Sequence, residues 1–187
     1  MFKELLAINW IKRIFSMKKD IEFKFDEEKS IEIILYLAKK IPEIDVFSIC
    51  KLFYLIDKVS LEERGRFICG EKYVAMQNGA VPSKTFDLLK KIRNNPTKDI
   101  VIENEVIIPQ REPNPDFFSQ FDVNCIKKVV GDNKDVSYWE RGQQTHDGAY
   151  KKAWDSRGNK KSNPMPVLSI AKEFPNSEEL IDYLVNN

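Results

Sequence analysis

Apolar residues recur at intervals of three and four along most of the chain, which is the spacing of one face of an α-helix. This periodicity predicts helices over residues 2–15, 31–41, 46–59, 83–94, 122–130, 136–143, 147–154 and 177–187. The predicted N-caps, whose side chains can accept a hydrogen bond from a first-turn amide, are Asp26 or Ser30, Asp45, Ser83 and Ser177. Segment 46–59 is apolar almost all round, so we expect it to form the central helix.

Two stretches lack the helical period. Between residues 65 and 82 a β-prone piece, Tyr73–Met76, stands among glycines, which predicts a shaped loop or a small β-element. Two β-branched runs, 100–102 and 106–108, flank a turn and predict a hairpin. Prolines keep residues 109–115 extended, and residues 157–164 are predicted to form a polar loop. The fold class is therefore mainly α with a small β-element (α+β), as a compact helical domain with a short β-hairpin.

The composition supports one domain with its own core. The 187 residues are 42% hydrophobic and 11% aromatic, which argues against a disordered or collagen-like chain. Thirty Lys and Arg against 29 Asp and Glu leave a net charge of +1, which argues against a dedicated nucleic-acid binder. The charge is uneven, because residues 1–19 carry a net +4 and residues 173–187 a net −4.

The N-terminal segment differs from the rest of the chain. We interpret residues 1–16 as a basic amphipathic helix that extends a domain spanning residues 17–187. The densest apolar run, Ile33–Ala38, is far shorter than the roughly 20 residues that cross a membrane, so no membrane span is predicted. The N-terminus lacks the unbroken apolar segment of a secretory signal, and three cysteines are an odd number. We therefore expect a cytoplasmic protein with free thiols.

Candidate chemistry is sparse. His146 is the only histidine, and Cys50, Cys69 and Cys125 show none of the close spacings of zinc ligands. The glycines match neither phosphate-loop fingerprint. The sequence thus predicts no catalytic residue, no cofactor and no metal. A basic stretch, Lys151–Lys161, contains Trp154 and could hold a nucleic-acid backbone, although a solvated loop is the commoner outcome for such a stretch.

One block of the sequence is more distinctive than its composition. It comprises Lys51-Leu52-Phe53-Tyr54-Leu55-Ile56-Asp57-Lys58, Leu61, Gly65-Arg66, Gly70-Glu71-Lys72-Tyr73-Val74-Ala75-Met76 and Gly79-Ala80-Val81-Pro82-Ser83. With Thr145-His146 and Trp154 further on, this block resembles the Panacea domain, also called the SocA-like antitoxin domain. The resemblance runs from about Met17 to Ala171. Ser60, Glu71 and Ala80 stand where the family often has histidine, aspartate and proline, which weakens any expectation of an obligatory catalytic or metal centre.

The resemblance implies a non-enzymatic antitoxin of a bacterial or prophage toxin–antitoxin system. Such a protein neutralises its cognate toxin by direct protein–protein binding. The toxin is expected to be encoded next to it, and a protease or a chaperone is a second kind of partner. The basic N-terminal segment would then be an addition that helps to choose the partner.

The candidate site residues are expected to act either as a domain signature or as partner contacts. They are Asp57, Gly65, Arg66, Gly70, Tyr73, Gly79, Val81, Pro82, Trp139, Thr145, His146 and Trp154. Glycines there permit turns closed to other residues. We expect Arg66 and Asp57 to form an ion pair that pins the loop to the central helix, and His146 to donate a hydrogen bond to the same region.

A partner interface is expected to use partly exposed aromatic side chains. The candidates are Tyr73, Trp139, Tyr150 and Trp154, with Arg141 and Arg157 at the rim. Two alternatives stay open at this point. One is a prophage-associated DNA-binding regulator, and the other is a hydrolase that uses His146, which would need this side chain exposed in a concave pocket.

Overall fold

The computed structural model describes residues 20–186, and the predicted N-terminal helix with its boundary at residue 16 lies outside them. The described residues form eight α-helices, one short 3-10 helix and two small antiparallel sheets. The mainly α fold class with a small β-element is thereby confirmed. None of the helices in this part of the chain is long and apolar enough to cross a bilayer.

The helices account for most of the described chain. In order they are α2 (Glu27–Lys40), α3 (Val46–Arg64), α4 (Ser83–Asn94), η1 (Pro115–Phe117), α5 (Gln120–Asn133), α6 (Tyr138–Gln144), α7 (Gly148–Asp155), α8 (Val167–Ala171) and α9 (Ser177–Asn186). The predicted N-caps at Asp26 and Asp45 are confirmed, since each carboxylate accepts from the amide three residues on.

The strands make two separate sheets. They are β1 (Tyr73–Met76), β2 (Gly79–Pro82), β3 (Ile100–Glu103), β4 (Val106–Pro109) and β5 (Asn163–Met165). One sheet has the order β2-β1-β5, and the other is the β3–β4 hairpin. Asn104 and Glu105, at the turn of that hairpin, both have positive φ, which matches the right-handed twist of the strands.

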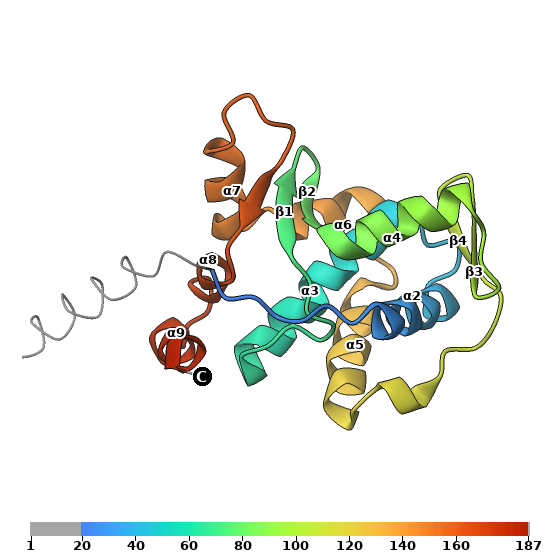
Figure 1. Ribbon diagram of the computed structural model, residues 1–187, viewed down its shortest axis with the longest axis horizontal. Helices are drawn as coiled ribbons and strands as arrows, with labels where there is room; N and C mark the ends of the chain where they lie inside the picture. The colour runs from blue at the N-terminus through green and yellow to red at the C-terminus, as the bar shows by residue number, and fades with distance from the viewer. Residues whose placement is uncertain (1–19, 187) are drawn as a thin grey trace, which may run out of the picture.

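Helix α3 runs through the middle of the molecule (Figure 1). On one side lie α2, α4, α5 and the β3–β4 hairpin, and on the other lie the β1–β2 hairpin, α7, α8 and α9. Two apolar clusters result, and α3 contributes to both: Ile49 and Phe53 belong to one, Tyr54 and Leu61 to the other. This placement confirms the prediction that segment 46–59 is central.

Helix α3 is longer than its apolar pattern predicts. It continues five residues past Val59 to Arg64, because Ser60 and Leu61 remain buried, and it ends where Gly65 takes a left-handed conformation. Tyr183 of α9 lies directly on Gly65, and a Cβ there would be 2.5 Å from the tyrosine ring. The end of α3 therefore also positions α9.

Several predicted boundaries are wrong. Residues 157–164 are not wholly a loop, because β5 begins at Asn163 and pairs with β1. A three-residue edge strand that contains a proline gives too little pattern to detect. Ser83 is the first helical residue of α4 and not its cap, since the N-cap is Pro82 and the Ser83 hydroxyl donates to the Lys72 carbonyl. Ser177 likewise lies within α9. Helix α8 was not predicted.

Candidate partner-binding surface

The residues that carry the resemblance gather around the β1–β2 hairpin, which packs against α3. Asp57 and Tyr73 lie beneath the base of the hairpin, and Gly79 and Thr145 lie at its tip. Val81 and Pro82 are buried residues of β2, paired with Val74 and Tyr73 of β1. Residues far apart in the sequence are therefore brought to one structural element.

At the base, Asp57 joins α3 to the loop that precedes β1. Its carboxylate accepts from the Ile68 amide and from the Tyr73 hydroxyl, each at 2.7 Å. The side chain of Asp57 is 2% exposed, and this burial raises its pKa to about 7, with the two hydrogen bonds acting in the opposite direction. Arg66 is not among the hydrogen-bond donors to Asp57 that the structure describes, so the predicted Arg66–Asp57 ion pair is wrong.

Arg66 pairs instead with Asp122 on α5, at 2.8 Å. Asp122 is buried because it also closes the capping box of α5 with Ser119, and it receives a second cation, Lys29 of α2, at 2.6 Å. These contacts outweigh the burial of Asp122 and hold its pKa below the usual range. The cation of Arg66 thus ties α5, rather than α3, to the loop.

Gly70 and Glu71 fix the entry into β1. Gly70 has φ +72°, and a Cβ at this position would lie 2.1 Å from the Lys24 carbonyl oxygen, so only glycine fits. Glu71 accepts from the amides of Lys84 and Thr85 at the start of α4, at 3.1 and 2.6 Å. This carboxylate takes the capping role that the sequence suggested for Ser83, a long-range contact with no local signal.

At the tip, Gly79 is enclosed by polar groups. Its φ is +109°, and a Cβ would lie 2.3 Å from Thr145 Oγ1 and 3.0 Å from Lys51 Nζ. The Thr145 hydroxyl accepts from the Ala80 amide and donates to the Gly142 carbonyl, at 3.2 and 2.8 Å. The Thr145 side chain therefore locks the hairpin to the end of α6.

Lys51 is a buried lysine with an unusual environment. Its side chain is 1% exposed, its ammonium donates to the Ala80 carbonyl at 2.8 Å, and it lies 4.6 Å from the centre of the Phe47 ring. Burial lowers its pKa to about 8. No pattern in the sequence predicts the burial of this residue, because a lysine on a helix is normally solvated.

His146 begins a stack of rings along α7. It lies parallel to Tyr150 at 4.4 Å between ring centres, Trp154 follows Tyr150 at 6.3 Å, and the Arg157 guanidinium covers Trp154 at 3.5 Å. The Tyr150 hydroxyl donates to the Met76 carbonyl at 2.9 Å, which ties the stack to the hairpin.

His146 Nε2 is buried and has no hydrogen-bond partner among the described residues. Burial lowers the pKa of His146, and the positive charge of Lys51 lowers it further. The imidazole is stacked on Tyr150 and is hydrogen-bonded to the backbone of Asn78, in the turn between β1 and β2, which agrees with the predicted hydrogen bond from His146 to this region. In the part of the chain that the structure describes, no carboxylate or thiol is hydrogen-bonded to it. This arrangement does not match that of a general base with an orienting acid.

Three expected interface residues are placed differently by the structure. Tyr73 and Tyr150 are 3% and 4% exposed, so they are core residues, and Arg141 is buried where it donates to the Asn133 carbonyl and the Ser48 hydroxyl. Trp154 and Arg157 are half-buried in the stack. These exposures correct the expectation that the aromatic residues of the hairpin region face a partner.

Helix α6 presents the exposed aromatic residues. Trp139 is 67% exposed and Tyr138 49%, and the Tyr138 ring lies 4.2 Å from that of Phe47. We call the surface formed by Phe47, Tyr138 and Trp139 the α6 aromatic face. Of the residues expected at an interface, Trp139 is the one that is largely exposed. Tyr138 was missed because the predicted helix over residues 136–143 is too short for its pattern to show which side chains face solvent.

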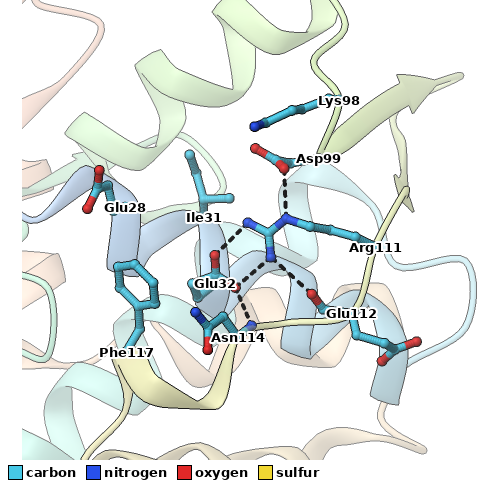
Figure 2. A pocket seen from close by; sticks show the side chains of 9 residues that line it. All are labelled: Glu28, Ile31, Glu32, Lys98, Asp99, Arg111, Glu112, Asn114 and Phe117. Carbon is cyan, nitrogen blue, oxygen red and sulfur yellow. Dashed lines mark hydrogen bonds and ion pairs between the residues drawn. The ribbon is translucent and has the colours of Figure 1, made fainter.

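A separate pocket of about 540 Å³ lies between α2 and the segments that flank the β3–β4 hairpin. Figure 2 shows the Arg111 guanidinium between Glu32 and Asp99 at its centre. Arg111 donates to both Glu32 oxygens and to Asp99, at 2.5 to 2.9 Å, and these partners raise its pKa. Because the one guanidinium holds a carboxylate of α2 and a carboxylate of the segment before β3, this cluster fastens the β3–β4 hairpin to α2.

The three thiols are buried and unpaired with one another. Burial raises the pKa of each, to about 12 for Cys50 and about 11 for Cys125, so none is a reactive thiolate near neutral pH. Within residues 20–186, no three His, Cys, Asp or Glu side chains are arranged to hold a metal ion.

Comparison with known proteins gives one finding. The model of the family described as antitoxin SocA-like, Panacea domain, matches residues 49–155, which is more than half of the chain and runs from α3 to the end of α7. This range is narrower than the expected 17–171, and it contains every candidate site residue. No curated protein and no solved structure gives a match.

Proposed function

This chain belongs to the family of SocA-like antitoxins with a Panacea domain, and from that premise we propose that it neutralises a cognate toxin by direct protein–protein binding. The family gives an antitoxin role in general. The specific mechanism, a toxin encoded by the adjacent gene and action in the cytoplasm are our proposals. Delivery of the bound toxin to a protease or a chaperone is a further step that the same complex would permit.

One observation carries this proposal: the residues of the family block form packing contacts. Asp57, Gly79 and Thr145 have their hydrogen bonds or close contacts inside the protein, so the block builds a stable body rather than a reaction centre. A stable body with a partner surface is what neutralisation by binding requires.

The two alternatives from the sequence receive no support. A hydrolase needs His146 accessible in a pocket beside an acid or a thiol, whereas His146 Nε2 is buried and the cysteine pKa values are raised. For DNA binding, the basic stretch Lys151–Lys161 is interrupted, because Trp154 is half-buried under Arg157 rather than open for base stacking.

The test is genetic. The adjacent reading frame is expressed alone and together with this protein from separately inducible promoters. We expect arrest of growth in the first case and rescue in the second, and the two purified proteins should co-elute as a complex. The proposal is wrong if the adjacent reading frame does not affect growth when expressed alone, or if co-expression of this protein leaves its toxicity unchanged.

A matched control distinguishes neutralisation by the folded protein from a lower level of toxin caused by co-expression of a second gene. The double variant Gly70→Ala/Gly79→Ala, which places a Cβ where neither glycine leaves room for one and should fail to fold, is expressed at the same level beside the toxin. Rescue by the wild-type chain and not by this variant shows that the folded body is needed. Equal rescue by both would count against neutralisation by the folded domain.

A further inference from the structure

The α6 aromatic face is the part of the described surface where large apolar side chains gather. Trp139 is 67% and Tyr138 49% exposed, and both follow directly on the N-cap Ser137. The other exposed large aromatic residue in residues 20–186, Tyr183, stands on α9, where its ring lies on Gly65. An exposed tryptophan beside a stacked tyrosine is typical of an interface anchor.

The face is held rigidly from below. Ser137 and Glu140 form a capping box, so the first turn of α6 is fixed. Arg141, one turn later, is buried and donates to the Asn133 carbonyl and to Ser48 on α3. Tyr138 rests on Phe47, whose other neighbour is the buried ammonium of Lys51. Side chains that are already ordered lose little entropy when a partner binds.

The segment that carries the face is acidic. Asp132, Asp135 and Glu140 are exposed within residues 131–144, and Lys134, the one exposed cation in this range, pairs with Asp135 at 3.8 Å. Asp45 is half-buried at the start of α3, and its charge partly opposes the burial that lowers the pKa of Arg141. The surface around Trp139 therefore favours a partner with positive charge at the edge of an apolar patch.

We propose that the α6 aromatic face is the toxin-binding surface, with Trp139 inserted into an apolar patch of the toxin that is rimmed by Lys or Arg. This inference rests on the proposed function and adds the place and the chemistry of the contact. The residues that build the fold and the residues that bind the toxin are then different sets, although both lie within residues 49–155, which the family model matches.

The probe is the purified protein encoded by the adjacent reading frame. It is used after the genetic test has shown that it arrests growth and that the wild-type chain restores growth. Trp139→Ala in the full chain should weaken its binding at least about tenfold, measured by calorimetry. The double variant Asp132→Lys/Asp135→Lys should slow association several-fold and reduce its dependence on salt.

Matched controls come from α9. Tyr183→Ala removes a comparably exposed aromatic residue, and Glu178→Lys/Asp182→Lys makes the same change of charge on exposed residues there. Both should bind the toxin like the wild type. Thermal unfolding of each variant shows whether a loss of binding reflects loss of the fold.

The outcomes are separable from those of the genetic test. If the adjacent gene product arrests growth, and the wild type and Trp139→Ala restore growth equally, the antitoxin function stands and the surface assignment is wrong. Weaker binding by Tyr183→Ala instead would move the contact to α9 and overturn the assignment as well. Self-association of the chain that Trp139→Ala abolishes, with toxin binding unchanged, would show that a second copy covers the face and would also overturn it.

Discussion

The β1–β2 hairpin and helix α6 are neighbours, since Thr145 at the end of α6 bonds the Ala80 amide, but they use aromatic and charged side chains differently. In the hairpin region Tyr73 and Tyr150 are buried, and their hydroxyls bond Asp57 and the Met76 carbonyl. On α6, Tyr138 and Trp139 face solvent. The tyrosine hydroxyls of the first region are satisfied inside the protein, whereas the aromatic rings of the second are exposed.

This difference distinguishes residues that matter for stability from residues that matter for binding a partner. A change at the hairpin disturbs groups that are buried and cannot find water, so its cost falls on stability. A change at Trp139 removes apolar area that is already in contact with water, so it should leave stability nearly unchanged and weaken the binding of a partner. Substitutions in the two regions should therefore be distinguishable by comparing unfolding with binding.

The largest effect is expected for Gly79→Ala. The positive φ and the contact of the new Cβ with Thr145 and Lys51 should together cost about 4 kcal/mol of stability. Chemical denaturation measures this loss. Gly131→Ala is the matched control, because a Cβ there meets no atom within 4 Å and α5 should gain about 0.5–1 kcal/mol. Equal stability of the two variants would mean that the hairpin tip is not locked.

An intermediate effect is expected for Asp57, and it depends on pH. Its pKa is about 7 in the folded protein, against an ordinary value for aspartate of 3.8. Between these values the folded protein keeps a proton that the unfolded chain has released, so stability falls as pH rises, by up to about 1.4 kcal/mol per pH unit. The contribution is present below about pH 4 and is lost above about pH 7.

Asp57→Asn removes this titration and retains an acceptor for the Ile68 amide. Urea denaturation at several pH values from 4 to 8 should give a shallower slope for the variant than for the wild type. Glu71 and Asp20, whose pKa values burial also raises, act on both proteins and cancel in the difference. Identical slopes would show that Asp57 is ionised throughout this range.

The smallest effect on stability is expected for Trp139→Ala. Because the side chain is 67% exposed, its removal should change the free energy of unfolding by less than about 0.5 kcal/mol. Differential scanning calorimetry of the variant beside the wild type measures the change. A loss comparable to that of a core residue would place Trp139 with the hairpin and end the contrast between the two regions.

Much of the fold could be predicted from local patterns. The caps at Asp26 and Asp45, the central α3 and the β3–β4 hairpin follow from residue spacing, because helix and strand periods act over a few neighbours. The end of α3 and strand β5 could not be predicted, since Leu61 and Asn163 acquire their contacts from residues about a hundred positions away.

The candidate site shows the same limit. The resemblance pointed to residues that the fold brings together around the β1–β2 hairpin, but the predicted partner of Arg66 was wrong, because Arg66 bonds Asp122 across 56 positions. The sequence also could not show that Tyr73 and Tyr150 are buried while Tyr138 is exposed, because a tyrosine occurs both in cores and at interfaces.

By itself, the sequence determined the helical class, the central apolar helix and the membership in an antitoxin family, because periodicity and a spaced block of residues need no knowledge of distant contacts. The tertiary structure alone decided that Lys51 and Glu71 are buried, that the His146 ring is stacked on Tyr150, and that Trp139 is largely exposed. Burial is set by which elements come together, and that is a property of the folded chain as a whole.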